Sequence, residues 1–121
     1  MSDTTSSLRV LVAEDEALVS MLVEDMLAEI GCTVIGPAAN LDEALALARE
    51  SEIDVALLDV NLAGKPVFPV ADLLRERGVP YIFASGYGEA GISDSHRGAP
   101  VLQKPFRESD LARILAGFKR A

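Results

Sequence analysis

The sequence predicts an α/β fold in which a parallel β-sheet is covered by helices on both faces. Five short segments of aliphatic and β-branched residues alternate along the chain with segments whose apolar residues recur at helical spacing. The strand segments contain too few polar residues to have a face in water, which is typical of a parallel sheet between two helical layers. A chain of 121 residues fits one such domain, since domains cluster around ~100–150 residues.

The first two elements have clear patterns. Residues 8–13 (LRVLVA) are short and almost entirely apolar, and an acidic pair follows them, which indicates a strand buried on both faces. The next apolar residues are spaced i, i+3, i+4, i+7, i+8 and i+11 from Val19 to Ile30, which predicts an amphipathic helix. Gly31 is placed to end that helix.

A second strand and helix follow. Residues 33–35 (TVI) predict a brief strand that Gly36-Pro37 closes. Asn40 and Glu43 have the spacing of a capping box. The helix that they begin has apolar residues at helical spacing: Leu41, Ala44, Leu45 and Ala48.

The third unit starts with the apolar strand 55–58 (VALL). A helical stripe follows over residues 67–74, in which Pro69 is tolerable only in the first turn, and Gly78 is placed to end the helix. Residues 79–84 predict the fourth strand.

Residues 101–103 predict the fifth strand, and an apolar stripe at Leu111, Ile114, Leu115 and Phe118 predicts the last helix. The stretch between strands four and five, residues 86–100, has four glycines and Ile92 as its one large aliphatic residue. Because glycine is ~1 kcal/mol poorer than alanine in a helix, we expect a mobile loop or a short turn there.

Charge and composition exclude several classes of partner. The chain has 11 basic and 19 acidic residues and a formal net charge of −8, so its long-range field repels nucleic acids and anionic lipids. With Cys32 alone, the chain can form neither an intramolecular disulfide nor a cysteine metal cluster. No apolar run reaches the ~20 residues of a membrane span, and residues 2–7 do not resemble a signal peptide. We expect a soluble, cytoplasmic monomer that binds neither nucleic acid nor membrane.

Polar residues follow the predicted strands at one kind of position. Glu14 and Asp15 follow the first strand, Asp59 the third, Ser85 the fourth and Lys104 the fifth. All lie at carboxyl ends, which is the edge of an open parallel sheet where ligands bind. We therefore expect these side chains to form one small site.

The residue types in this site favour phosphoryl chemistry. Three clustered carboxylates need a compensating cation, and an all-oxygen site suits Mg²⁺. Together with Lys104, a divalent ion would cancel their formal charge, so that a phosphoryl group could approach. Asp59 is the natural nucleophile, Ser85 can donate a hydrogen bond to the phosphoryl group, and Gly86 has no side chain to block the approach.

Each residue alone has a simpler interpretation. An aspartate at a strand end is usually a turn or helix cap, and Glu14-Asp15 could begin a helix as favourable dipole charges. The joint placement of five such residues at one edge, with nothing comparable at the other, is what favours a site.

At these residues the chain resembles the receiver domain of two-component response regulators, over residues 8 to about 118. The resemblance rests on Glu14-Asp15, Asp59, Ser85 and Lys104-Pro105-Phe106. It implies a flavodoxin-like, CheY-like doubly wound sheet of five strands in the order 2-1-3-4-5. It also implies that residues 8–121 are a receiver domain, for which residues 1–7 would be a disordered tail.

The resemblance also implies roles for single residues. Asp59 would be the phosphoacceptor and Lys104 would contact the phosphoryl oxygens. Glu14, Asp15, Asp59 and the backbone carbonyl of Asn61 would bind Mg²⁺. Lys104-Pro105 fits the family's cis peptide.

Two departures concern the switch. The family usually has an aromatic residue three positions before the lysine, where this chain has Val101. Residues 83–87 (FASGY) are similar to a receiver subgroup with a Phe-Ala-Thr-Gly-Tyr signature and a weak or absent fourth helix. We expect Ser85, Gly86 and Tyr87, with Val101 and Pro105, to carry the switch or the partner contact, and the loop 86–100 to replace the missing aromatic.

Three functions remain to be separated. The first is a single-domain response regulator that accepts phosphate from a histidine kinase or phosphotransfer protein and signals through protein contacts, with at most slow autophosphatase activity. After Phe118 only three residues remain, so no output domain is expected. The second is a Mg²⁺-dependent phosphohydrolase of the haloacid dehalogenase type, which needs an acid/base aspartate where this chain has Asn61. The third is an interaction module independent of phosphorylation.

His96, without a partner at metal-ligand spacing, is expected to be solvated.

Overall fold

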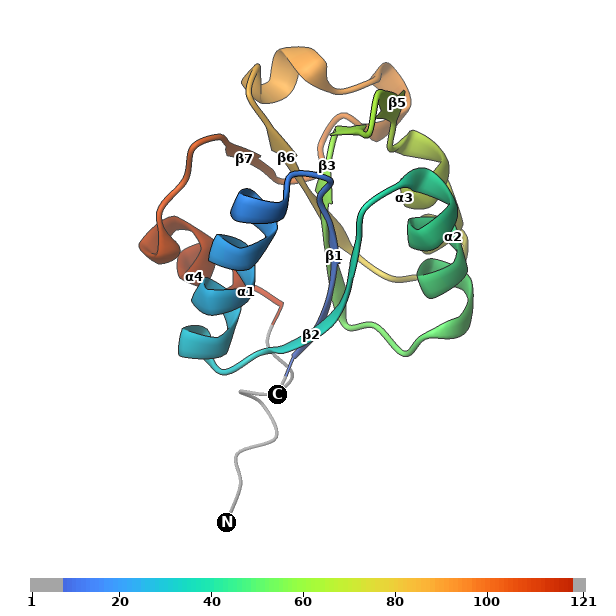
Figure 1. The fold of residues 1–121 in the computed structure, drawn as a ribbon. Helices are drawn as coiled ribbons and strands as arrows, with labels where there is room; N and C mark the ends of the chain where they lie inside the picture. The colour runs from blue at the N-terminus through green and yellow to red at the C-terminus, as the bar shows by residue number, and fades with distance from the viewer. Residues whose placement is uncertain (1–7, 119–121) are drawn as a thin grey trace.

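Five parallel strands form the centre of the molecule, and two pairs of helices cover the faces of this sheet (Figure 1). The computed structural model describes residues 8–118. The strands of the sheet are β1 (Arg9–Ala13), β2 (Thr33–Ala38), β3 (Val55–Asp59), β6 (Tyr81–Ser85) and β7 (Val101–Gln103), and the helices are α1 (Ala17–Ile30), α2 (Leu41–Glu50), α3 (Phe68–Glu76) and α4 (Glu108–Ala116). Their order across the sheet, β2-β1-β3-β6-β7, confirms the predicted order 2-1-3-4-5.

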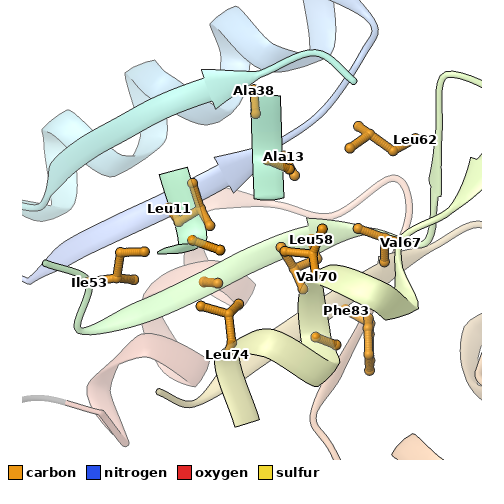
Figure 2. Close-up of a cluster of buried hydrophobic side chains, with 14 of the residues drawn as sticks. Leu11, Ala13, Ala38, Ile53, Leu58, Leu62, Val67, Val70, Leu74 and Phe83 are labelled. Carbon is orange, nitrogen blue, oxygen red and sulfur yellow. The ribbon is translucent and has the colours of Figure 1, made fainter. Parts of the chain in front are cut away.

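The strands have hydrophobic side chains on both faces, because successive residues of a strand point to opposite sides. On one face, Leu11, Leu58 and Phe83 pack with buried residues of α2 and α3 (Figure 2). On the other face, Val10, Val12, Leu57 and Ile82 pack with residues of α1 and α4. The predicted two-sided burial is thus confirmed for β1, β3 and β6, whereas the edge strands β2 and β7 are partly exposed.

The local signals at helix ends are also confirmed. Gly31 ends α1 in the left-handed conformation, with φ 100°, and donates its N–H to the carbonyls of Leu27 and Ala28. The side chain of Asn40 caps α2 by accepting the N–H of Glu43, and the Glu43 carboxylate accepts the N–H of Ala39 in return. In α3, Pro69 lies in the first turn, as predicted.

The prediction that Gly36-Pro37 closes the second strand is wrong. Strand β2 continues through both residues to Ala38, with an irregularity in its register against β1. Because β2 is the edge strand of the sheet, the missing N–H of proline is tolerated there. Both Gly36-Pro37 and Lys104-Pro105 are cis, and the second agrees with the expectation from the resemblance.

A short hairpin that the sequence analysis did not predict follows β3. Strands β4 (Asn61–Leu62) and β5 (Lys65–Pro66) pair antiparallel around Ala63-Gly64, which have φ 53° and 85°. Two consecutive residues with positive φ are typical of a tight hairpin turn. The hairpin stands at the same edge of the sheet as the carboxyl end of β3 (Figure 1).

The segment between β6 and β7 has no α-helix, as the four glycines predict. It consists of two short 3-10 turns, η2 (Gly88–Gly91) and η3 (Asp94–His96), joined by extended residues. Ile92, its one large aliphatic residue, is buried in the cluster on the α2 and α3 side.

The expectation that His96 is solvated is wrong, because its side chain is fully buried. Its Nε2 lies 2.8 Å from Oδ1 of Asp72 on α3, and its Nδ1 lies 2.8 Å from the hydroxyl of Tyr81 on β6. The ring stacks on Phe68 and meets Phe83 edge to face. Both ring nitrogens are therefore satisfied by elements far from His96 in the sequence, which the loop composition alone could not indicate.

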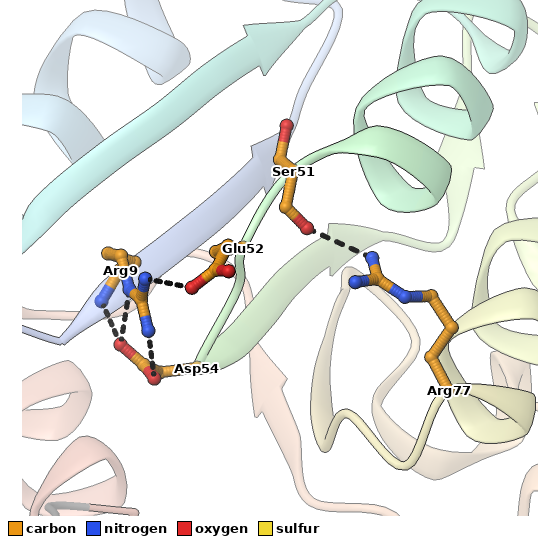
Figure 3. A network of polar contacts seen from close by, with 5 residues as sticks. All are labelled: Arg9, Ser51, Glu52, Asp54 and Arg77. Carbon is orange, nitrogen blue, oxygen red and sulfur yellow. Dashed lines mark hydrogen bonds and ion pairs between the residues drawn. The ribbon is translucent and has the colours of Figure 1, made fainter.

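The opposite edge of the sheet is held by a polar network (Figure 3). Arg9, at the start of β1, binds the Asp54 carboxylate with its backbone N–H and its guanidinium, and it also reaches Glu52. Arg77 donates to the carbonyl oxygens of Ala48 and Ser51 at the end of α2. The Arg9 contacts join the amino ends of β1 and β3, and the Arg77 contacts join the carboxyl ends of α2 and α3, away from the predicted site.

Two further expectations concern the N-terminal residues and membrane spans. Residues 1–7, predicted to be a disordered tail, lie outside the described residues. Among residues 8–118, no helix is both long and apolar enough to cross a bilayer.

We predict that His96→Ala lowers the free energy of unfolding by about 2–3 kcal/mol, because it leaves a cavity among three aromatic rings and removes partners of Asp72 and Tyr81. Urea unfolding measures the loss. Arg97→Ala is the control, since the Arg97 side chain is exposed and pairs with the exposed Asp94, so that this substitution should cost less than ~0.5 kcal/mol. Equal stability of the two variants would show that the loop is not anchored by His96.

Candidate functional site

The polar residues singled out from the sequence meet at the carboxyl edge of the sheet. Glu14 follows β1, Asp59 is the last residue of β3, Ser85 is the last residue of β6, and Lys104 follows β7. The strand register fixes how far along the sheet each of these residues lies, because Asp59 is opposite Ala84 and Ser85 is opposite Gln103. Four strands from distant parts of the sequence therefore supply one site.

Three carboxylates form the centre of this site. Glu14, Asp15 and Asp59 each offer an oxygen atom, and these atoms all lie within 4.8 Å of one another. Glu14 is buried, Asp59 is nearly so, and Asp15 is exposed at the mouth. The oxygen donors and their spacing fit a hard divalent cation such as Mg²⁺.

Lys104 is the cation among these carboxylates. Its Nζ lies 3.1 Å from Oε1 of Glu14 and 3.2 Å from Oδ2 of Asp59. The ammonium therefore bridges two of the three acidic groups. Backbone N–H groups engage other oxygens: Glu16 donates to Oε2 of Glu14 and Asn61 donates to Oδ1 of Asp59.

The electrostatics of the cluster are unfavourable for the metal-free chain. Burial, and then repulsion by the Glu14 carboxylate, raise the pKa of Asp59 from 3.8 to about 6, although Lys104 acts in the opposite direction. Burial alone would lower the pKa of Lys104, but its hydrogen bond to Glu14 and the charge of Asp59 outweigh burial and raise it. One ammonium thus does not fully compensate the acidic groups.

Ser85 is less accessible than its place at a sheet edge suggested. Its side chain is buried, with 3% of the residue exposed. Its Oγ accepts the N–H of Tyr87 at 3.0 Å, and its carbonyl accepts the N–H of Lys104 at 2.9 Å. The residue is held between the site and the segment that replaces the fourth helix.

The other predicted residues surround the site to different degrees. Gly86 and Pro105 are exposed, and Tyr87 is 83% exposed. Val101 is partly buried and pairs with Phe83, on the other side of β6 from β3. Asn61 begins the unpredicted hairpin, directly after the strand that ends at Asp59.

An apolar groove adjoins the site, and the sequence analysis missed it. It has a volume of about 270 Å³ between α1 and the segment after β7, and it is lined by Val19, Leu22, Val23, Met26, Lys104, Pro105 and Phe106. Leu22, which the helical stripe placed in the core, is 58% exposed, and Leu18 and Met21 are exposed beside it. A signal was available, since Leu18 and Met21 are apolar residues outside the stripe.

Sequence comparison identifies related proteins over most of the chain. The response regulator receiver domain family matches residues 10–116. The transcriptional regulatory protein PdtaR of Mycobacterium tuberculosis is 32% identical over 114 residues, which are 91% of this chain and 56% of PdtaR. The chain thus spans about half the length of the curated relatives that it matches.

Solved structures agree with the fold. The solution structure of SdrG from Sphingomonas melonis Fr1 is 38% identical, covers 98% of both chains and has a TM-score of 0.82. The BeF3-activated conformation of SdrG from Pseudomonas melonis Fr1 is 39% identical, covers 96% of this chain and 97% of that one, and has a TM-score of 0.76.

We predict that Asp59→Asn raises the free energy of unfolding at pH 7.5 without divalent cations, by about 2 kcal/mol, because it removes a buried charge from the carboxylate cluster. The folded-state pKa of Asp59 lies above its unfolded value, so its ionisation costs stability as pH rises from about 4 to 6. The advantage of the variant should therefore shrink as the pH falls through that range.

Urea unfolding in the presence of a chelator measures this difference. Asp25→Asn, an exposed position on α1, is the matched control and should leave stability unchanged within ~0.5 kcal/mol. A destabilised Asp59→Asn at pH 7.5 would mean that the bridge to Lys104 outweighs the repulsion.

Proposed function

The chain belongs to the response regulator receiver domain family, and from this premise we propose that Asp59 accepts a phosphoryl group in a Mg²⁺-dependent reaction. The donor is a histidine kinase or a histidine-bearing phosphotransfer protein. The observation that carries the proposal is the position of Lys104, whose Nζ bridges Asp59 and Glu14 in a cluster of three carboxylates. This arrangement supplies a carboxylate nucleophile, a fixed cation and oxygen ligands for a metal ion.

The transfer is a substitution at phosphorus. A carboxylate oxygen of Asp59 forms the new P–O bond while the P–N bond of the donor phosphohistidine breaks, and its electron pair returns to the imidazole nitrogen. The product is an acyl phosphate on Asp59. Catalysis in this kind of transfer comes from positioning and charge stabilisation, which the rigid carboxyl edge of a parallel sheet can supply.

Glu14, Asp15, Asp59 and the backbone carbonyl of Asn61 would hold the Mg²⁺ ion, Glu14 either directly or through water. When bound, the ion neutralises charge on the transferring phosphoryl oxygens. Lys104, already within hydrogen-bond distance of Asp59, is placed to contact one of those oxygens. Its ammonium would then leave Glu14 or share its donors between the two groups.

Ser85 and its neighbours would pass the signal on. Its hydroxyl would leave the N–H of Tyr87 to donate to the phosphoryl group, and the segment 86–100 would respond, since Tyr87 is its second residue. Val101 stands where the family usually has an aromatic switch, so this segment takes over that role. Tyr87, which is largely exposed, is available to a downstream protein.

The apolar groove is the proposed contact for the phosphodonor. A donor histidine must reach Asp59, and the groove includes Lys104, which lies 3.2 Å from Asp59. The exposed Leu18, Met21 and Leu22 extend it along α1. A helical donor with an apolar face fits such a surface.

The phosphohydrolase alternative is less consistent with the site. It requires a general acid two residues after the nucleophile, and Asn61 cannot transfer a proton. We therefore propose a phosphoacceptor with at most slow autophosphatase activity. A module independent of phosphorylation would not need Lys104 within reach of two carboxylates, one buried and one nearly so.

We predict that acetyl phosphate with Mg²⁺ adds one phosphate to the intact protein, and that the addition requires both Asp59 and the metal ion. Intact-mass spectrometry detects the product. Asp25→Asn is the control and should be phosphorylated like wild type. Phosphorylation that persists in Asp59→Asn, or in the presence of a chelator, would contradict the proposal that Asp59 is a Mg²⁺-dependent phosphoacceptor.

We also predict that Lys104→Ala folds but is phosphorylated more slowly, by about tenfold or more, because a fixed positive charge is lost at the transferring oxygens. Single-turnover phosphorylation, followed by mass, measures the rate. A rate equal to that of wild type would exclude the proposed contact between Lys104 and the phosphoryl group.

A further inference from the structure

Ser85 has two neighbours that fix the resting position of its hydroxyl. One is the N–H of Tyr87, which donates to its Oγ at 3.0 Å. The other is Gly91, the last residue of η2, because a Cβ atom at position 91 would lie 2.9 Å from that same Oγ. Real Cβ atoms do not come this close to other heavy atoms, so the hydroxyl occupies the space that a side chain at 91 would need.

The backbone conformation does not explain why glycine stands at this position. Gly88 and Gly98 have positive φ values of 57° and 102°, which favour glycine, but Gly91 has no such value. The other atoms near a Cβ at 91 are the Cβ of Tyr87 at 3.9 Å and the Cβ of Ser85 at 4.0 Å, both at ordinary contact distance. Among residues 8–118, leaving aside the two chain neighbours of Gly91, the hydroxyl of Ser85 is thus the one group that a methyl group at 91 would meet at less than ordinary contact distance.

The chain around Gly91 cannot easily move away. Ile92, the next residue, is buried in the core cluster on the α2 and α3 side. Four residues further, His96 is held by Asp72 and Tyr81. A crowded contact at position 91 is therefore relieved most readily by Ser85, whose hydroxyl changes position by rotation about one bond.

We propose that Gly91 is a positioning residue that sets the resting position of the Ser85 hydroxyl and thereby the cost of its turn toward a phosphoryl group on Asp59. The proposal rests on the proposed function. Its new element is a steric link between position 91 and Ser85: the absence of a side chain at 91 stabilises the resting position, and any side chain there disfavours it.

The sign of the effect follows from which state contains the close contact. In the resting state a methyl group at 91 meets the hydroxyl. Once the hydroxyl donates to the phosphoryl group, it has left that space and the contact is relieved. Gly91→Ala thus raises the free energy of the resting state more than that of the activated state, so a phosphoryl analogue should bind more tightly.

The test is the affinity for beryllofluoride in the presence of Mg²⁺, measured by calorimetric titration of the whole chain. Gly91→Ala should bind about fivefold more tightly than wild type, or more. In a Ser85→Ala background the oxygen is absent, and the same change at 91 should alter the affinity less than about twofold. A residue with a merely structural role would not give tighter binding that depends on Ser85.

Gly117→Ala is the matched control. Gly117 has an ordinary φ of −72°, and a Cβ there would meet its nearest atom at 3.5 Å, far from Ser85 in the chain. It should leave beryllofluoride affinity unchanged.

Each outcome decides one point. If wild type does not bind beryllofluoride, the proposed function fails. If wild type binds but Gly91→Ala binds equally or more weakly, or if its effect persists without the Ser85 hydroxyl, the steric link is refuted while the proposed function stands. If Gly91→Ala does not fold, the Ser85→Ala/Gly91→Ala double variant should fold, and its failure to do so would also refute the link.

Discussion

The repulsion among Glu14, Asp15 and Asp59 is the constraint on which the rest of this structure depends. Burial, and then repulsion by the Glu14 carboxylate, disfavour the ionised form of Asp59 and raise its pKa. The cluster persists because its residues lie at the ends of buried strands, and the packing of both sheet faces fixes where those strands end. The fold thus keeps three carboxylates close together, which an unfolded chain would not do, and a divalent cation would offset their negative charge.

The two sides of the site are held by different contacts. Strands β1 and β3 are central, and the Arg9 network joins their amino ends (Figure 3). Strand β6 leads instead into a segment without an α-helix, which rests on Ile92 and on the contacts of His96. Because the segment is anchored at these points, the hydroxyl of Ser85 can change position by rotation of its own side chain while the carboxylate cluster stays in place.

The sequence was informative where a pattern is local or follows from topology. The stripe from Val19 to Ile30 predicts α1, the glycines of residues 86–100 predict the lack of a helix, and the carboxyl-end rule brings Glu14, Asp59 and Lys104 together. Contacts between distant elements were not predictable in this way. The hydrogen-bond partners of His96 lie on α3 and β6, and no sequence pattern indicates that either residue contacts a histidine.

Other differences arise because composition does not define the surroundings of a residue. Gly36-Pro37 looks like a strand end, yet an edge strand accepts a proline because one of its sides has no neighbour. Leu22 fits the apolar stripe of α1 but lies exposed at a groove beside Lys104. The proposed role of Gly91 depends on a single oxygen atom six residues earlier, a contact that the sequence does not indicate.

The most direct test of the carboxylate cluster as a metal site is a Mg²⁺ titration followed by amide NMR, in which the signals of Asp15, Asp59 and Asn61 should shift together and saturate at one ion per chain. Non-saturating shifts spread over exposed acidic residues such as Glu89 and Asp94 would contradict it.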